Sequence, residues 1–444
     1  MLSEQNPHWF AEWTAGGIRR ELLDLIRREL DVDHVIAISG IRRCGKSFLL
    51  KQIMGELLKA NVPADNLLFM NLEQALYTGM QSNEILDKLL AEYRRLRNPQ
   101  GRIYLFLDEI QTLENWEIWV KYEYDLHKGR IKFFISGSNS RLLSSEFATH
   151  LTGRVIEHRL TPFSFREYLI FRDFDPGKEA EWIVKRERIL HYFGEYMQRG
   201  GMPEGLTAQY RDTARTLLMG TFDSVIYKDI VPRFGIRQSE TLRKLGLYLI
   251  GQSGNISNLN KIGTMLGTNR NQVREYIGYL ESALLIHVLP KFEYSERKQF
   301  LSQKKVYVCD NGFISDLAFQ FSADRGDLLE NVVLSELLRR RFRVYYYKNQ
   351  AECDFIVYDY GREQASYQVC VELTPENRQR EFRGLLAGCR EIKINSGTIL
   401  TWNQEEQLEQ NGTQISVIPV WKWLLQLDYG QPTHEKWMDL PINQ

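Results

Sequence analysis

A loop from Gly40 to Ser47 has the clearest chemical potential in this sequence. It reads Gly-Ile-Arg-Arg-Cys-Gly-Lys-Ser and matches the pattern G-x-x-x-x-G-K-[ST]. Such a loop can hold phosphates where it joins a strand to a helix, because its backbone N–H groups and the helix dipole then face the anion. Residues 34–39 form a short apolar run before the loop, and a helical pattern starts at Lys46. These flanks favour a site for a nucleoside triphosphate over a chance glycine-lysine turn.

The backbone and the side chains of this loop have separate expected roles. Lys46 is expected to contact the β and γ phosphates of ATP, and Ser47 to ligate Mg²⁺. Gly40 and Gly45 are expected to let the backbone turn closely around the anionic oxygens. The residues predicted to bind ATP are Gly40, Ile41, Arg42, Arg43, Cys44, Gly45, Lys46, Ser47, Phe48 and, from a later segment, Ser138.

Two carboxylates follow the apolar run 103–107 and are predicted to complete the site. Asp108 would bind Mg²⁺ through water, and Glu109 would polarise the attacking water as general base. The other interpretation is a strand that ends in a solvated acidic turn. Next to the phosphate loop, the pair favours catalysis, and the sequence predicts hydrolysis of ATP.

Two further segments contain candidate residues with two interpretations each. Ser138 lies in the polar cluster 136–140, which suits either contact with the γ phosphate or the attacking water, or an ordinary helix-capping turn. Arg154, in Leu-Thr-Gly-Arg, is a candidate catalytic residue that stabilises charge during phosphoryl transfer, in its own subunit or in a neighbouring one. A solvated or ion-paired arginine is the alternative for Arg154.

These side chains need a sheet whose strand ends meet at one edge. Predicted strands alternate with predicted helices over residues 1–160, and this alternation indicates a parallel, doubly wound sheet with an N-terminal helix. The expected strands are 34–39, 66–72, 103–107 and 131–136, and the expected helices are 18–30, 46–58, 82–97 and 116–126.

The alternation stops after Arg154, and further domains are predicted beyond it. Residues 161–235 have aromatic-rich helical patterns with a turn at 200–203. Residues 236–300 predict a winged-helix-like domain, with helices at 240–251, 258–267 and 269–282 and a strand at 285–289. Residues 301–444 return to α/β patterns, with strands at 344–347, 353–357, 367–373, 397–401 and 415–420. The expected fold class is α/β multidomain.

The composition narrows the class of protein. Lys plus Arg and Asp plus Glu both total 57, so no overall charge attracts nucleic acid or an anionic membrane. The 5 cysteines are scattered, which indicates reduced thiols and disfavours structural zinc. The N-terminus lacks a signal-peptide pattern, and no apolar run approaches the roughly 18 residues that span a bilayer. We therefore expect a soluble cytoplasmic protein without a membrane partner.

Together the motifs resemble those of a known family, the AAA-type ATPases of bacteria and archaea that carry a C-terminal domain of unknown function. The resemblance covers nearly the whole chain and implies ATP binding and hydrolysis. The motifs that carry it are the loop 40–47, Leu-Asp-Glu-Ile-Gln at 107–111, Ser-Gly-Ser at 136–138, Leu-Thr-Gly-Arg-Val at 151–155, Leu-Thr-Pro-Phe-Ser-Phe-Arg-Glu-Tyr at 160–168 and Gly-Gly-Met-Pro-Glu at 200–204.

The winged-helix-like segment raises the question of DNA. The polar face of its helix 269–282 carries side chains that suit phosphate contacts and base edges. Winged helices also serve protein contacts, and the surrounding charge is balanced. Contact with DNA and contact with a protein therefore both stay open. The polar residues of this face are Asn269, Arg270, Asn271, Gln272 and Arg274.

The C-terminal domain resembles the restriction-endonuclease-like fold, in which an acidic residue on one strand and an E-x-K triplet on the next bind a metal and activate water. Asp354 fits the first carboxylate, but Gln368 and Cys370 stand where glutamate and lysine are expected. A shifted register at Glu372 restores a carboxylate and still supplies no lysine. A retained fold with a degenerate site is the preferred hypothesis, and an active DNA nuclease is the weakest one.

One leading hypothesis and one rival follow for the whole chain. In the first, ATP hydrolysis drives or switches a conformational change in the winged-helix and nuclease-like domains, on DNA or on a protein client. In the rival, nucleotide switches the chain between conformations for protein binding without DNA, and turnover is incidental. No pattern in the sequence specifies an oligomeric state.

Overall fold

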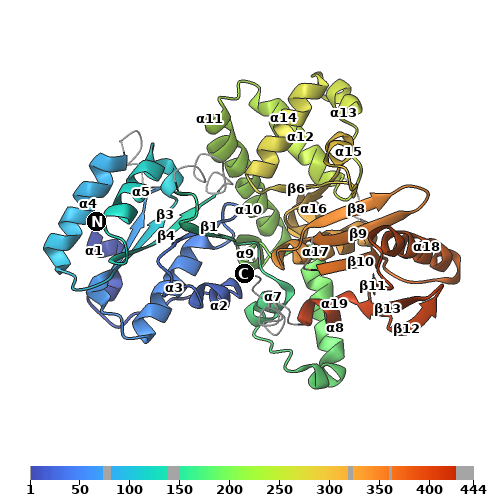
Figure 1. The fold of residues 1–444 in the computed structure, drawn as a ribbon, viewed down its shortest axis with the longest axis horizontal. Coiled ribbons are helices and arrows are strands. Elements are labelled where there is room, and N and C mark those ends of the chain that lie inside the picture. The colour runs from blue at the N-terminus through green and yellow to red at the C-terminus, as the bar shows by residue number, and fades with distance from the viewer. Residues whose placement is uncertain (1, 74–81, 139–150, 319–323, 360–362, 427–444) are drawn as a thin grey trace, which may run out of the picture. The chain divides into compact units, whose positions relative to one another are not determined.

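The computed structural model describes residues 2–73, 82–138, 151–318, 324–359 and 363–426 (Figure 1). The chain divides into two compact units. The first comprises Met1–Phe163, Met202–Leu245 and Asn271–Ile286, and the second comprises Ser164–Gly201, Gly246–Arg270 and His287–Gln444. Each unit therefore combines stretches that are distant in the sequence.

The first unit contains a five-stranded sheet in the order β2-β3-β4-β1-β5. All neighbouring strands in it are parallel, as the alternation of strands and helices predicted. Apolar side chains fill both faces, which is typical of parallel sheets covered by helices. The strands are β1 (Val35–Ser39), β2 (Leu67–Asn71), β3 (Ile103–Asp108), β4 (Ile131–Gly137) and β5 (Val155–Arg159).

Helices cover both faces of this sheet (Figure 1). Buried residues of α4 and α5, including Leu86 and Trp116, form one core with Leu105 and Phe133 of the strands. The helix predicted over 18–30 is shorter than expected at both ends, since residues 18–20 are irregular and residues 28–30 form a turn. The helices are α1 (Leu2–Gln5), α2 (Leu22–Arg27), α3 (Lys46–Lys59), α4 (Ser82–Arg97) and α5 (Trp116–Leu126).

Strand β5 was not expected from the sequence, which predicted that the alternation ends at Arg154. It pairs with β1 at the edge of the sheet, and His158 is its only buried residue. An edge strand needs no continuous apolar run, and Val-Ile-Glu-His-Arg has none.

The first unit also contains a run of helix with an unusual turn. Helix α10 (Arg211–Ser224) continues into a π-helical turn, η7 (Val225–Ile230), and then into α11 (Val231–Phe234). The Val231 N–H donates to the carbonyl of Ile226, five residues back. Pro232 follows and has no N–H to continue an α-helical ladder. The short helix α9 (Pro203–Thr207) precedes this run.

The second unit contains a six-stranded mixed sheet in the order β12-β13-β11-β10-β9-β8. Strand β10 ends at Val369, although the prediction extended it to 373. Instead of continuing the ladder, the Leu373 backbone binds the side chain of Gln404 through both its N–H and its carbonyl. The strands are β8 (Val344–Lys348), β9 (Glu352–Asp359), β10 (Glu363–Val369), β11 (Ser396–Thr401), β12 (Glu406–Gln410) and β13 (Thr413–Pro419).

Most remaining elements belong to the second unit. The strand β6 (Ile286–Leu289) pairs with β7 (Lys305–Val308). The helices α7 (Phe165–Phe171), α8 (Trp182–Arg199), α13 (Leu259–Leu266), α15 (Glu296–Leu301), α16 (Asn311–Leu317), α17 (Arg325–Arg339), α18 (Pro375–Ile392) and α19 (Val420–Leu425) complete it.

The predicted winged-helix segment has its helices in the expected order, α12 (Ser239–Gly251), α13 and α14 (Arg270–Ser282), followed by β6. The compact units divide this segment, with α13 in the second unit and most of α14 in the first. The winged-helix and nuclease-like assignments, and the domain boundaries at 161, 236 and 301, stay predictions.

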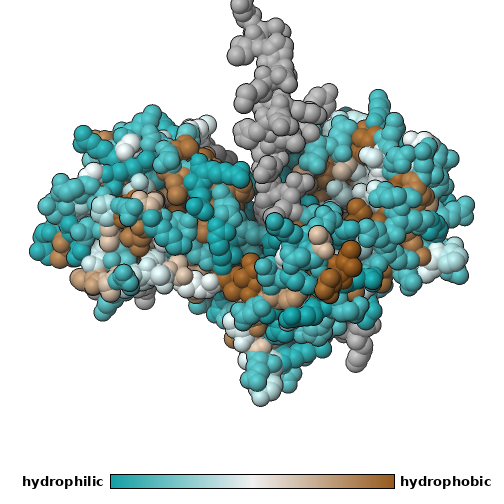
Figure 2. Space-filling model, turned by 90° about the horizontal axis from the view of Figure 1, so that it is seen from below, coloured by the Kyte–Doolittle hydropathy of each residue, from teal (hydrophilic) through white to brown (hydrophobic). Residues whose placement is uncertain are grey.

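Exposed large hydrophobic side chains occur at scattered positions of the described surface, among them Ile183, Val184, Phe300 and Leu301. The face shown in Figure 2 is mostly hydrophilic, with hydrophobic side chains in small, separate groups. Among the described helices, none combines the length and the apolar composition needed to cross a membrane.

Candidate functional site

The predicted phosphate loop joins the end of β1 to the start of α3, as its pattern requires. Gly40 is needed for close packing, since a Cβ there would lie 2.5 Å from the Leu160 carbonyl oxygen and 2.7 Å from Cys44 Sγ. Gly45 is needed for its backbone conformation, with φ at +104°. The structure therefore explains why glycine is needed at both positions of the pattern.

Arg20 supports the loop from behind, a role that no sequence motif signalled. Its guanidinium donates to the carbonyl oxygen of Cys44 at 2.8 Å and to that of Thr161 at 2.6 Å. The same group lies 5.0 Å from the ring centre of Phe163. Arg20 is 2% exposed and fixes the loop to the segment that follows β5.

Lys46 and Glu109 form a buried ion pair at the centre of the site. Lys46 Nζ lies 3.1 Å from Glu109 Oε1 and donates to the Gly40 carbonyl at 3.2 Å. Burial favours the neutral form of Lys46, but the neighbouring acidic groups, Glu109 first among them, together outweigh it and raise the pKa of Lys46. Burial likewise opposes the charge of Glu109, and Lys46 nevertheless lowers the pKa of that carboxyl. Both groups are therefore charged at neutral pH.

Asp108 lies at the end of β3 and is fully buried. The Ser136 hydroxyl of β4 donates to Asp108 Oδ1 and also accepts from the Glu109 N–H at 3.1 Å. Asp108 Oδ2 is buried and has no hydrogen-bond partner among the described residues. Burial and the Glu109 charge raise the pKa of Asp108, and nearby Ser47 opposes the rise. An unpaired buried carboxylate oxygen beside a serine hydroxyl is a donor set that suits Mg²⁺.

Gln111 links two of the predicted residues and was not itself predicted. Its Nε2 donates to Glu109 Oε2 and, at 3.3 Å, to the hydroxyl of Ser138. Ser138 is fully buried and lies beside Gln111, and its contact with ATP stays a prediction. Residues 139 and 140 of the same polar cluster lie outside the described residues. Glu109 itself has a left-handed backbone conformation, with φ at 55°.

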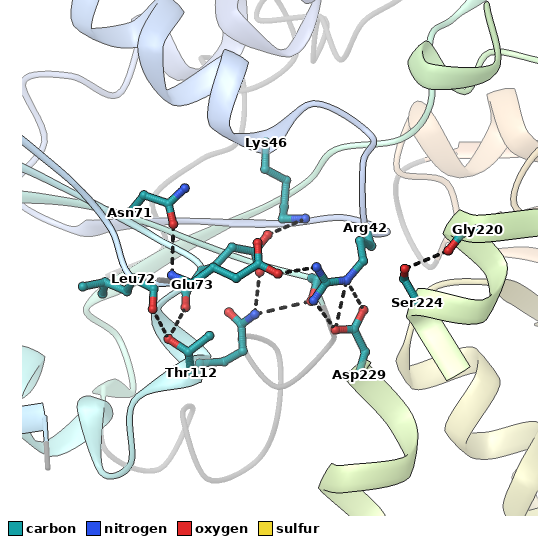
Figure 3. Close-up of polar contacts among 12 residues, drawn as sticks. Arg42, Lys46, Asn71, Leu72, Glu73, Thr112, Gly220, Ser224 and Asp229 are labelled. Atoms are coloured by element: carbon teal, nitrogen blue, oxygen red, sulfur yellow. Dashed lines mark hydrogen bonds and ion pairs between the residues drawn. The ribbon is translucent and has the colours of Figure 1, made fainter. Parts of the chain in front are cut away.

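The other residues of the loop differ in what they expose. Ile41 and Cys44 are buried, so any contact with ATP would come from their backbone. Phe48 is 55% exposed. Arg42 and Arg43 extend to carboxylates, Arg42 to Glu73 and Asp229 and Arg43 to Glu204 (Figure 3 for Arg42).

The structure places Arg154 away from the loop, which disfavours, among the alternatives left open, a role in its own subunit. The Arg154 carbonyl accepts from the N–H of Val35, which is the first residue of β1. The phosphate loop follows Ser39, the last residue of the same strand. Five residues of strand separate these ends by about 16 Å. The Arg154 side chain lies 3.3 Å from Asp125 Oδ1, which fits the alternative of an ion-paired arginine.

In the second unit, Asp354 of β9 is buried and accepts from the Val369 N–H at 2.8 Å. Lys305 of β7 is also buried and lies 2.9 Å from Glu352 Oε1 and 4.0 Å from Glu330 Oε2. Burial raises the pKa of Asp354 to about 6, although Lys305 opposes the rise. Within the described residues, no group of three His, Cys, Asp or Glu side chains is arranged to hold a metal. Lys305 thus compensates the charge of partly buried acids around it, and the degenerate nuclease-like site stays a prediction.

Comparison with known proteins assigns three segments of the chain. Residues 32–169 match the model of an AAA domain. Residues 190–324 match a domain of unknown function (DUF8612), and residues 325–423 match another (DUF4143).

Whole-length relatives and solved structures were also found. An uncharacterized protein of Methanocaldococcus jannaschii is 30% identical over 90% of this chain and 91% of its own. An uncharacterized protein of Haemophilus influenzae is 32% identical over 92% of this chain and 98% of its own. RuvB of Thermotoga maritima is 17% identical, with a TM-score of 0.26, over 61% of this chain and 89% of its own. The chain belongs to a family of proteins in which a P-loop AAA domain precedes two domains of unknown function.

Proposed function

We propose that this chain binds ATP with Mg²⁺ at the loop 40–47 and hydrolyses it. One observation carries this proposal: Lys46, Asp108 and Glu109 meet at the carboxyl ends of β1 and β3, parallel strands of one sheet with β4 between them. In an open parallel sheet, ligands bind at this edge. The AAA-domain match over 32–169 supports the same activity.

The residues of the site divide the work of binding. The backbone of the loop and the Lys46 ammonium would hold the phosphates. Ser47 and the unpaired oxygen of Asp108 would hold Mg²⁺. When bound, Mg²⁺ supplies positive charge that stabilises the charge developing on the phosphoryl oxygens.

Glu109 would orient the attacking water and accept its proton. A general base must be ionised, and the hydrogen bond that Gln111 donates to Glu109 favours the ionised carboxylate independently of Lys46. When ATP binds, the Lys46 ammonium would leave Glu109 and bind the phosphates, so the Glu109 carboxylate would become available to the water. Gln111 holds the other carboxylate oxygen of Glu109 and fixes its orientation.

A further part of the proposal concerns what ATP binding and hydrolysis do to the rest of the chain. We infer that ATP changes the conformation of the segments beyond the AAA domain, acting on DNA or on a protein partner. The α14 helix exposes Arg270 and Arg274, two cations that could contact the phosphates of DNA. A nucleotide-dependent switch that binds only protein is the second candidate.

The first test is ATP binding by the whole chain. Lys46→Ala should reduce ATP affinity by about tenfold or more, because it removes a buried charge from the phosphates. Lys59→Ala is the matched control, since Lys59 is 75% exposed at the far end of the same helix. Equal, weak binding by all three proteins in equilibrium dialysis would overturn the proposal.

A further inference from the structure

The phosphate loop is joined to a helical segment that follows it far along the chain. Arg42 Nε donates to both carboxylate oxygens of Asp229, at 3.3 and 3.1 Å, and its Nη2 donates at 2.7 Å (Figure 3). Its Nη1 donates to Glu73. The guanidinium thus holds two carboxylates from within the loop that is proposed to bind phosphate.

The contact with Asp229 is the stronger of the two. The Arg42 side chain is 14% exposed and that of Asp229 only 5%, whereas that of Glu73 is 44% exposed. Bidentate, charge-assisted hydrogen bonds are strong, and loss of one buried partner leaves the charge of the other uncompensated. Solvent screens the pair with Glu73.

Asp229 lies in the π-helical turn η7, which interrupts an otherwise α-helical run. Such turns are rare and are frequently found at functional sites. Pro232 explains part of the geometry, because it cannot donate to a carbonyl of the preceding turn. The turn places the Asp229 carboxylate against the loop, so a change at Arg42 acts directly on η7.

A second arginine of the loop binds the same segment. Arg43 has a left-handed backbone, with φ at 67°, and its side chain binds Glu204 of α9. Glu204 also accepts from the Thr221 hydroxyl of α10 at 3.0 Å. Consecutive arginines of the loop therefore both bind segment 203–234.

We propose that Arg42 and Asp229 form a nucleotide-responsive switch, in which the phosphates of bound ATP compete for the Arg42 guanidinium and release Asp229 and η7 from the loop. This proposal rests on the proposed function, because it requires ATP at the loop. Repulsion between the phosphates and the Asp229 carboxylate acts in the same direction. ATP binding then loosens segment 203–234 before hydrolysis occurs.

Amide hydrogen exchange of the whole chain, with and without Mg²⁺ and ATP, tests the switch. ATP should raise exchange over residues 225–234 by about tenfold, the loss expected for a buried charged pair. Asp229→Asn should raise exchange without ATP and remove most of the response to it. Asp223→Asn is the matched control, because Asp223 lies on the same helical run and pairs with Arg243 at 2.8 Å, outside the loop. It should keep the response.

The outcomes separate the switch from the ATPase proposal. If ATP binds in a Lys46-dependent manner and exchange over 225–234 does not change, the switch is wrong and the ATPase proposal stands. If ATP does not bind, both fail. If Asp229→Asn does not fold, the unsubstituted chain with and without ATP still decides the question. A response that Asp229→Asn retains in full would also overturn the switch.

Discussion

Lys46 Nζ lies 3.1 Å from Glu109 Oε1, so the cation of the phosphate loop and the proposed general base are paired with each other. Each keeps the other charged against the effect of burial. ATP would have to separate them, because phosphate and carboxylate compete for the same ammonium group.

Substitution of the base should separate binding from hydrolysis. Glu109→Gln keeps the shape of the side chain but removes the proton acceptor, so we expect kcat to fall by about 10²- to 10⁴-fold. ATP affinity should stay the same or rise, because Lys46 no longer has a competing carboxylate. Phosphate release and equilibrium binding on the same protein measure the two effects. Unchanged turnover would remove Glu109 from the role of base.

A methyl group at Gly40 should disturb the loop. Gly40→Ala places a Cβ 2.5 Å from the Leu160 carbonyl, and such overpacking costs about 1 to 3 kcal/mol. We expect a lower free energy of unfolding in urea and weaker ATP binding. Gly16→Ala is the control, since a Cβ there meets nothing within 4 Å. Equal stability of the two variants would contradict the packing argument.

Alkaline pH should stabilise the chain through Lys132 of β4. Burial, then the charge of Arg102, lowers the pKa of Lys132 from 10.5 to about 8. Between these values the unfolded chain binds more protons than the folded one, so stability rises as pH rises through this range and is constant outside it. The rise should be about 3 kcal/mol.

Urea unfolding at both ends of that pH range measures this contribution. Lys132→Met fills the same space without a titratable group, so the rise in stability over this pH range should be absent from it. The variant also loses the hydrogen bonds of Lys132 Nζ to three backbone carbonyls, a loss that does not produce this rise. A difference that does not depend on pH would show that Lys132 is not the titrating group.

The DNA hypothesis predicts a defined salt dependence. Replacement of Arg270 and Arg274 by Ala should weaken DNA binding and reduce the slope of log affinity against log salt by about one for each lost phosphate contact. Fluorescence anisotropy with a short duplex at several salt concentrations measures the slope. An unchanged slope would move the DNA contact away from α14, and no binding at low salt would favour a protein partner.

The sequence by itself determined the parallel sheet and the residues at its edge. The loop 40–47 is set by local chain geometry, because a strand, a glycine-containing turn and a helix follow one another directly. Asp108, Glu109 and Ser138 follow other strands of the same parallel sheet, and such strands end at one edge. These conclusions need only the order of elements along the chain.

The tertiary structure alone decided which distant groups reach that edge. Arg154 is close to the site in motif order, but it precedes β5 and so lies at the opposite end of β1. Asp229 is 187 positions from Arg42, and Arg20 is 141 positions from Thr161. Side chains at such separations meet through packing, which leaves no periodicity or spacing in the sequence. The physical reason is that local sequence patterns determine helices and strands. Packing between those helices and strands determines which side chain lies next to a buried charge.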